Sequence, residues 1–74
     1  MPNIELLRLG SEREFKKLFE LQAPRILNTA LYLLGNRQDA EDVTQEVFKS
    51  IVVGVAGFKA ESSIQTWVYR ITLN

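Results

Sequence analysis

Residues 39–48, DAEDVTQEVF, indicate the fold of this chain. Apolar side chains recur there at the three- and four-residue spacing of an α-helix, and polar side chains fill the positions between them. Extended to residue 55 at about 100° per residue, one side of the helix carries Ala40, Val43, Val47, Ile51 and Val55, with Thr44 and Phe48 beside them. The opposite arc carries Glu41, Asp42, Gln45, Glu46 and Lys49. The stretch therefore predicts an amphipathic helix with an acidic outer face.

The residues that precede this helix predict a short helix and a longer helical segment. Residues 3–9 predict the short helix, which ends at Gly10. Ser11 and Glu14 then have the spacing of a capping box, in which each side chain accepts a hydrogen bond from the backbone amide of the other residue. Behind this cap, one helical stripe comprises Phe15, Leu18, Phe19 and Gln22, and an apolar face comprises Ile26, Leu27, Ala30, Leu31 and Leu34.

Proline, glycine and cap residues mark the remaining boundaries. Pro24 either kinks the long segment or begins a new helix at its first turn. Gly35 is a natural helix stop, and Asn36 is a natural cap for the acidic helix. The last helix begins at Ser62 or Ser63 and places on one stripe Ile64, Trp67, Val68 and Ile71. No convincing strand pattern occurs, so we expect an all-α fold, a compact bundle of about four helices.

The composition excludes several classes of protein. Seventy-four residues make one small domain, and a hydrophobic fraction of 46% is ordinary for a globular chain. Neither cysteine nor histidine is present, which excludes a disulfide scaffold, a cysteine nucleophile and an ordinary zinc site. No apolar run approaches the roughly 18–20 residues of a membrane span, and no signal peptide is evident, so we expect a cytoplasmic protein without membrane association. Zero net charge argues mildly against tight nonspecific binding to duplex DNA.

The acidic face admits two interpretations. Most such faces are only solvated, and geometry alone favours that view. However, Val52 and Val53 fall on the polar arc, where they place apolar surface beside the carboxylates, and a basic, helical partner would fit this combination. The spacing of Asp39, Glu41 and Asp42 fits no metal loop. We therefore expect no metal, no cofactor and no enzymatic activity.

Two motifs, in the order found here, resemble a known family. They are LLGNRQDAEDVTQEVFKSI at residues 33–51 and SSIQTWVYRI at residues 62–71, the latter followed by Asn74. Together they closely resemble the second conserved domain of bacterial extracytoplasmic-function (ECF) sigma factors, the small alternative specificity subunits of RNA polymerase. The resemblance runs from about Phe15 to Asn74, so residues 1–74 are interpreted as a single sigma region 2 domain.

The resemblance implies that the acidic helix binds RNA polymerase. In this family the corresponding helix docks on the coiled-coil clamp helices of the largest subunit of the polymerase core. Carried over to this sequence, the polymerase-binding residues are Asp42, Gln45, Glu46, Lys49 and Val52. Charged contacts of this kind steer association and fix register more than they add affinity. Asp39 and Glu41 are assigned instead to capping and solubility.

The resemblance also implies that the C-terminal part binds promoter DNA, at the non-template strand of the minus-ten element. The loop at residues 54–63 corresponds to the loop that captures a flipped base, whose extrusion costs a few kcal/mol. The DNA-binding candidates are Phe58, Lys59, Ser62 and Ser63 in the loop, and Thr66, Arg70 and Asn74, spaced four apart, on the last helix. Alternatives stay open: Phe58 fills the core, Ser63 caps the helix, and Trp67 is a core residue.

The family usually continues into a basic stretch, a linker and a C-terminal helix-turn-helix domain, so we expect this chain to be a fragment of a longer protein. Ile64 stands where an aromatic residue is common, and Gly54 and Gly57 soften the end of the acidic helix. The expected function is promoter recognition and melting in transcription initiation. The alternatives are a helical protein-interaction domain without DNA recognition and a duplex-binding helix-turn-helix module. An anti-sigma factor usually masks these faces in the family, and nothing in the sequence identifies one.

Overall fold

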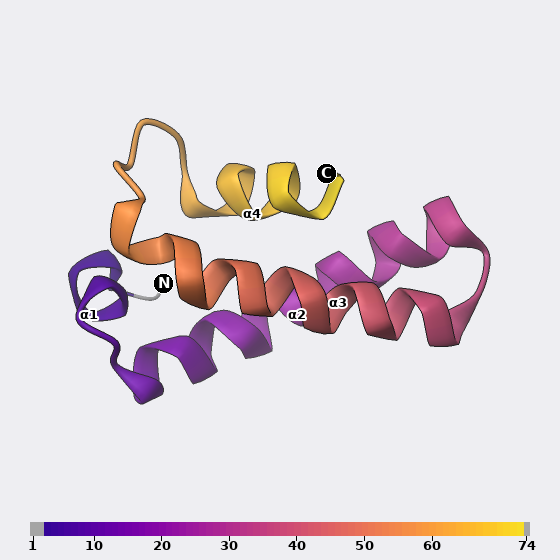
Figure 1. Cartoon of the computed structure of the whole chain (residues 1–74), viewed down its shortest axis with the longest axis horizontal. Helices are drawn as coiled ribbons and strands as arrows, with labels where there is room; N and C mark the ends of the chain where they lie inside the picture. Colours follow the sequence, from indigo (N-terminus) through magenta and orange to yellow (C-terminus); the bar gives the residue numbers. More distant parts are fainter. Residues whose placement is uncertain (1–2, 74) are drawn as a thin grey trace.

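The computed structural model describes residues 3–73, which form four α-helices and one 3₁₀ turn (Figure 1). The helices are α1 (Ile4–Arg8), α2 (Glu12–Leu34), α3 (Arg37–Gly54) and α4 (Ile64–Leu73), and the turn η1 (Val55–Gly57) follows α3 directly. These residues include no strand, and the predicted all-α bundle is confirmed. No helix in this part of the chain has both the length and the apolar character of a membrane span.

α2 and α3 form an antiparallel pair that sets the length of the molecule (Figure 1). At about 1.5 Å per residue, the 23 residues of α2 account for the longest dimension of 35 Å. Gly35 ends α2 with φ +69°, which glycine adopts without strain, and its N–H donates to the Leu31 carbonyl at 2.8 Å. The Asn36 side chain accepts a hydrogen bond from the N–H of Asp39 at 3.0 Å. Both predicted boundaries are confirmed.

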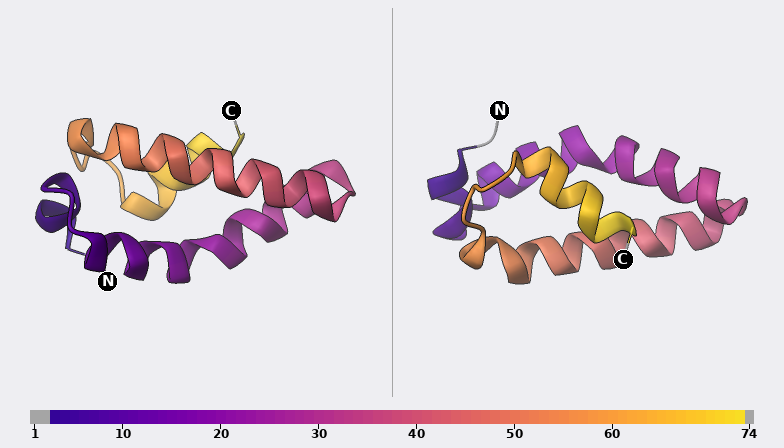
Figure 2. Two further views of the ribbon diagram at one scale, coloured as in Figure 1. Left: turned by 60° about the horizontal axis from the view of Figure 1, so that its bottom comes forward. Right: turned by 90° about the horizontal axis from the view of Figure 1, so that it is seen from above.

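α2 continues through Pro24 and does not restart there. Because proline lacks an N–H and its ring crowds the preceding turn, a hydrogen bond of the helix is missing at this point. Figure 2 shows that α2 bends along its length, whereas α3 beside it is straighter. Of the two alternatives that the sequence leaves open, the structure has the bent, continuous helix.

The core lies between α2, α3 and α4, and α1 closes one end of it (Figure 1). α4 contacts both α2 and α3, while α1 packs against α2 and η1. The buried apolar side chains of the core are Leu7, Leu18, Ile26, Val47, Ile51, Val55, Phe58, Ile64 and Val68. The predicted inner side of α3 is confirmed, although Val55 lies in η1 and not in α3.

Two residues of α2 that the sequence places on its inner side are only half covered. Phe19 and Leu34 are 51% and 48% exposed. Phe19 packs at the edge of the core, where its ring lies 4.7 Å from that of Phe48, measured between centroids. Leu34 lies in the last turn of α2, beyond the point where α4 ends (Figure 1). The exposure of Leu34 follows from the short reach of α4, whereas Phe19 lies in the first half of α2, where it lines a hollow formed by α2 and α3 alone.

The predicted capping box at the start of α2 is only half right. Ser11 Oγ accepts a hydrogen bond from the Glu14 N–H at 3.3 Å, as the prediction requires. The Glu14 carboxylate does not return to Ser11 but accepts from the N–H of Asn3 at 2.7 Å. It also pairs with Lys17 at 3.0 Å, and the Ser11 N–H donates to the Leu6 carbonyl instead. The physical reason is that α1 packs on α2 and offers Glu14 a donor from outside its own helix.

The pH dependence of stability tests this arrangement. The hydrogen bond from Asn3, and next the ammonium of Lys17, lower the pKa of Glu14 below its ordinary value of 4.5. The ionised carboxylate therefore stabilises the fold above pH 4.5, and this contribution is lost as the pH falls through the lower folded pKa. We expect Glu14→Gln to flatten the acid side of a plot of melting temperature against pH, followed by circular dichroism.

Glu12→Gln is the matched control, because Glu12 is an exposed carboxylate in the same first turn of α2. It should leave the acid slope of the melting temperature as it is in the wild type. Equal slopes for the wild type and Glu14→Gln would contradict the proposed role of Glu14.

Candidate functional site

α3 presents to solvent every residue that the sequence assigns to polymerase binding. The exposed residues, called here the α3 outer face, are Asp42, Gln45, Glu46, Lys49 and Val52. Val52 is 56% exposed and the neighbouring Val53 is 81% exposed, so the predicted apolar surface beside the carboxylates is confirmed. Because the opposite side of α3 is buried in the core, these side chains stand on a rigid element.

The carboxylates of α3 differ in how they are paired. Glu41 Oε1 accepts from Arg37 at 3.2 Å, and Glu46 Oε1 pairs with Lys49 at 3.1 Å. Among residues 3–73, Asp42 has no ion-pair partner within 4.0 Å. Surface pairs such as these contribute little stability. Among the described residues, the α3 outer face therefore offers one unpaired carboxylate, at its N-terminal end, to a cation from another molecule.

The end of η1, the loop after it and α4 surround a small pocket of about 210 Å³. The residues that line this loop pocket are Gly57, Phe58, Lys59, Glu61, Ser62, Trp67 and Arg70. It brings together four of the predicted DNA-binding residues from two segments of the chain. Two of these are cations, against the single carboxylate of Glu61, so the pocket has an excess of positive charge. Such a site suits a planar, anionic ligand of the nucleotide type.

Phe58 and Trp67 form the inner wall of the loop pocket. Their ring centroids lie 5.1 Å apart, and Phe58 is only 6% exposed. Trp67 is half-buried against the core, and its ring lies so close to Gly54 that a Cβ there would come within 3.2 Å of it. Because Gly54 has no side chain, the Trp67 ring can pack against the end of α3. Phe58 and Trp67 each pack on the core with one side, as the alternative interpretation of both residues requires, and line the loop pocket with another.

Two further DNA-binding candidates, Ser63 and Thr66, lie outside the loop pocket. Ser63 Oγ accepts from the Thr66 N–H at 3.1 Å and donates to Thr66 Oγ1 at 2.9 Å, so its hydroxyl caps α4. Thr66 lines a separate hollow of about 280 Å³ between α2 and α4. The buried Gln22 and the exposed Arg25 of α2 also line this hollow. Asn74 lies outside the described residues. Thr66 and Arg70 are both exposed on α4, as the four-residue spacing predicts.

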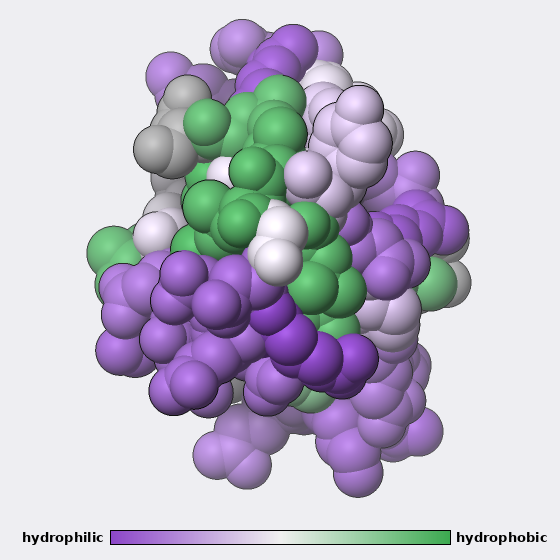
Figure 3. All heavy atoms as spheres, turned by 90° about the vertical axis from the view of Figure 1, so that its right-hand side faces the viewer, coloured by the Kyte–Doolittle hydropathy of each residue, from purple (hydrophilic) through white to green (hydrophobic). Residues whose placement is uncertain are grey.

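An apolar groove of about 410 Å³ lies at the far end of the α2–α3 pair. Figure 3 shows this end as an apolar band bordered by polar side chains. Leu33 and Leu73 are 57% and 51% exposed there, and Glu46 of the α3 outer face lines one side of the groove. The groove therefore adjoins the α3 outer face but is separate from the loop pocket.

Comparison with known proteins places the chain in a family. The sequence profile named Sigma-70 region 2 matches residues 18–74, which include α3, the loop pocket and α4. The chain belongs to the sigma-70 region 2 family. The resemblance noted in the sequence is thereby confirmed. The matched segment holds every residue of the α3 outer face and every predicted DNA-binding residue of this sigma region 2 domain.

Curated relatives of this sigma region 2 domain carry sigma-factor names. The ECF RNA polymerase sigma factor SigW of Bacillus subtilis is 30% identical over 71 residues, or 96% of this chain and 38% of that protein. The RNA polymerase sigma-H factor of Pseudomonas aeruginosa is 31% identical over 71 residues, or 96% and 37%. The ECF RNA polymerase sigma-E factor of Haemophilus influenzae is 39% identical over 62 residues, or 80% and 33%. The chain thus spans less than two-fifths of the length of these relatives. No solved structure matches it significantly.

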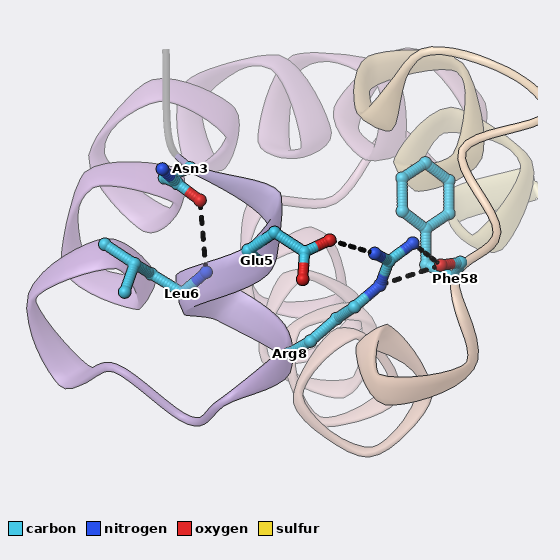
Figure 4. Close-up of polar contacts among 5 residues, drawn as sticks. All are labelled: Asn3, Glu5, Leu6, Arg8 and Phe58. Atoms are coloured by element: carbon cyan, nitrogen blue, oxygen red, sulfur yellow. Dashed lines mark hydrogen bonds and ion pairs between the residues drawn. The ribbon is translucent and has the colours of Figure 1, made fainter.

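One contact in the sigma region 2 domain has no signal in the sequence. Arg8 of α1 donates to the backbone carbonyl of Phe58 through Nε at 3.0 Å and also through Nη2 (Figure 4). The two residues are 50 positions apart. Helical periodicity and caps relate only neighbouring residues, so no local pattern points to Arg8.

Ser62 and Ser63 provide a matched test of the α4 cap. Ser63→Ala removes the acceptor for the Thr66 N–H and should lower the free energy of unfolding by about 1 kcal/mol. Ser62 only donates to the carbonyl of Ser63, so Ser62→Ala should change it by less than about 0.5 kcal/mol. Urea denaturation followed by circular dichroism measures both. The reverse ranking of the two variants would contradict the assignment of Ser63 as the cap.

Proposed function

We propose that this chain is the part of an RNA polymerase sigma factor that connects the polymerase core to promoter DNA. In this proposal the α3 outer face docks on the clamp helices of the largest polymerase subunit. The loop pocket and α4 bind the non-template strand of the minus-ten element and help to melt it. The observation that carries the proposal is the presence of both surfaces, exposed and separate, within the segment that matches sigma-70 region 2.

Charge and shape support docking on a basic helical partner. Within residues 3–73 the Asp42 carboxylate has no ion-pair partner, and Gln45 lies one helical turn away and is exposed, so both side chains can meet a partner helix laid along α3. Val52 adds apolar area at the end of the same row. Protein interfaces combine apolar area, which excludes water, with polar contacts, which fix the register of the two partners.

The loop pocket supports binding of an unstacked base. A base removed from the duplex loses stacking and pairing worth a few kcal/mol, which the protein must offset with a shaped pocket and hydrogen bonds. Phe58 and Trp67 offer aromatic surface, and Ser62 offers a hydroxyl. Lys59 and Arg70 are exposed at the same pocket, where they are suited to contact phosphates of the strand that carries the base.

The proposed role is recognition without catalysis, carried out in the cytoplasm where the polymerase core acts. Asn74 and Thr66 would extend the DNA contact along α4, and an anti-sigma factor would inhibit by covering these surfaces. The second candidate function, a protein-interaction domain that binds no DNA, is favoured by the α3 outer face alone. The two candidates differ only in what the loop pocket binds, so they can be separated by substitutions there.

Docking is tested with a purified clamp-helix fragment of the bacterial polymerase. We expect Asp42→Ala and Gln45→Ala each to weaken binding by about 1–2 kcal/mol, measured by isothermal titration calorimetry. Asp39→Ala removes the same charge from the first turn of α3, outside the proposed contact, and is the matched control. Retained helicity by circular dichroism excludes unfolding as the cause. Unchanged affinity in both Asp42→Ala and Gln45→Ala would leave the acidic residues as a merely solvated surface.

DNA binding is tested at Arg70. Arg70→Ala should weaken binding to single-stranded DNA, and the slope of log affinity against log salt should fall by about 0.7 for one lost phosphate contact. Binding to the clamp-helix fragment should not change. Arg37→Ala, at an exposed arginine beside the α2–α3 connection, removes the same charge far from the loop pocket (Figure 1). If Arg70→Ala and Arg37→Ala weaken DNA binding equally, the loop pocket is not the DNA site.

A further inference from the structure

Arg8 joins the N-terminal helix to the start of the loop that lines the pocket. Its guanidinium donates two hydrogen bonds to one acceptor, the carbonyl oxygen of Phe58, and its third nitrogen pairs with Glu5 (Figure 4). Hydrogen bonds from a charged donor are stronger than neutral ones, and a planar guanidinium with two bonds fixes direction as well as distance. The side chain is only 28% exposed, so water competes weakly for these bonds.

α1 is anchored to the rest of the domain at two points, so Arg8 projects from a supported helix. Leu7 is fully buried and belongs to the same core cluster as Val55 and Phe58. The N–H of Asn3 donates to the buried Glu14 carboxylate of α2 at 2.7 Å. Among residues 3–73, the backbone of α1 lies close to α2 and η1 and not to α3 or α4. It therefore acts on the loop pocket and not on the α3 outer face.

The loop is anchored at its two ends and weakly between them. At one end, the Phe58 N–H donates to the Val55 carbonyl while the Phe58 carbonyl accepts from Arg8. At the other end, Ser63 caps α4. For residues 59–62 the only hydrogen bond found within the described part of the chain is local, from Ser62 Oγ to the Ser63 carbonyl. Ala60 also has φ +57°, a conformation that costs a non-glycine residue energy.

We infer that Arg8 is a positioning residue for the loop pocket, holding the Phe58 carbonyl so that Lys59 and Ser62 are presented to DNA. This inference rests on the proposed DNA-binding function. Arg8 touches no part of the proposed ligand and acts only through the backbone of Phe58. Without it, the loop keeps its anchor at Ser63 and loses one constraint at Phe58, so the pocket is ordered only when DNA binds. The free energy needed to order the loop on binding then weakens the affinity for DNA and reduces the discrimination between bases.

The test compares Arg8→Gln, Arg8→Lys and a charge-matched control in the full chain. Arg8→Lys keeps the charge but replaces two directed donors by one point charge, so it should restore only part of the function. Arg13→Gln removes one positive charge at an exposed position at the start of α2 and is the control. The DNA probe is a labelled single-stranded pool of random sequence, whose bound fraction is sequenced to give base preference as well as affinity. Binding to the clamp-helix fragment is measured in parallel.

Trp67 provides a direct readout of the loop. It is the only tryptophan in the sequence, and its ring packs against that of Phe58. We expect Arg8→Gln to increase quenching of Trp67 fluorescence by acrylamide, because the Phe58 backbone is no longer held. It should weaken DNA binding about tenfold and flatten the base preference, while binding to the clamp-helix fragment stays within about twofold of the wild type.

The outcomes separate this inference from the proposed function. If the wild type binds no DNA, the DNA-binding part of the proposed function fails, whatever Arg8 does. If the wild type binds DNA and Arg8→Gln binds with the same affinity and base preference, the positioning role is wrong and the proposed function stands. Equal losses of DNA and clamp-helix binding would show a general loss of structure and also overturn the positioning role. If Arg8→Gln does not fold, Arg8→Lys decides: wild-type base preference overturns the inference, and a flattened preference supports it.

Discussion

The burial of one side of α3 is the constraint on which the other features of this domain depend. α3 packs against α2, η1 and α4, so its inner residues, such as Val47 and Ile51, have no freedom to turn outward. A helix fixed on one side must show the other side to solvent, and here that side carries the unpaired Asp42 and the exposed Val52. The same burial directs the chain through η1 into the loop, and thereby places the loop pocket beside the end of α3.

The sequence predicts the parts of this fold that depend on neighbouring residues. The boundary at Gly35 and Asn36, the inner side of α3 and the cap at Ser63 each follow from spacings of a few residues, and the structure has them all. Pro24 was ambiguous, because a kinked helix and a new helix satisfy the same local rules. Whether proline bends a helix or ends it depends on the packing on either side, which the local sequence does not contain.

The features that sequence reasoning missed are contacts between distant segments. Glu14 has the spacing of a capping box, yet its carboxylate goes to the amide of Asn3, because α1 returns across α2 and supplies a donor. Arg8 has no partner nearby in the sequence apart from Glu5, and its bonds to Phe58 appear only once α1 and η1 are packed together. The candidate site was thus predicted as two exposed sets of residues, whereas the gathering of four DNA-binding candidates in one pocket, and the support of that pocket by α1, required the fold.

The contact between Arg8 and Phe58 also bears on how the chain acquires its structure. α2 and α3 are joined by two residues and close upon each other with little loss of chain entropy, so this pair is suited to form first. Arg8 leaves the ribosome early, but its acceptor follows 50 residues later. The contact of α1 with η1 and Phe58 therefore cannot form until most of the domain has been synthesised, and the amides of α1 should exchange with solvent hydrogen more readily than those in the middle of α3. The contact that steadies the loop pocket thus forms late in synthesis, although Arg8 is among the first residues to be made.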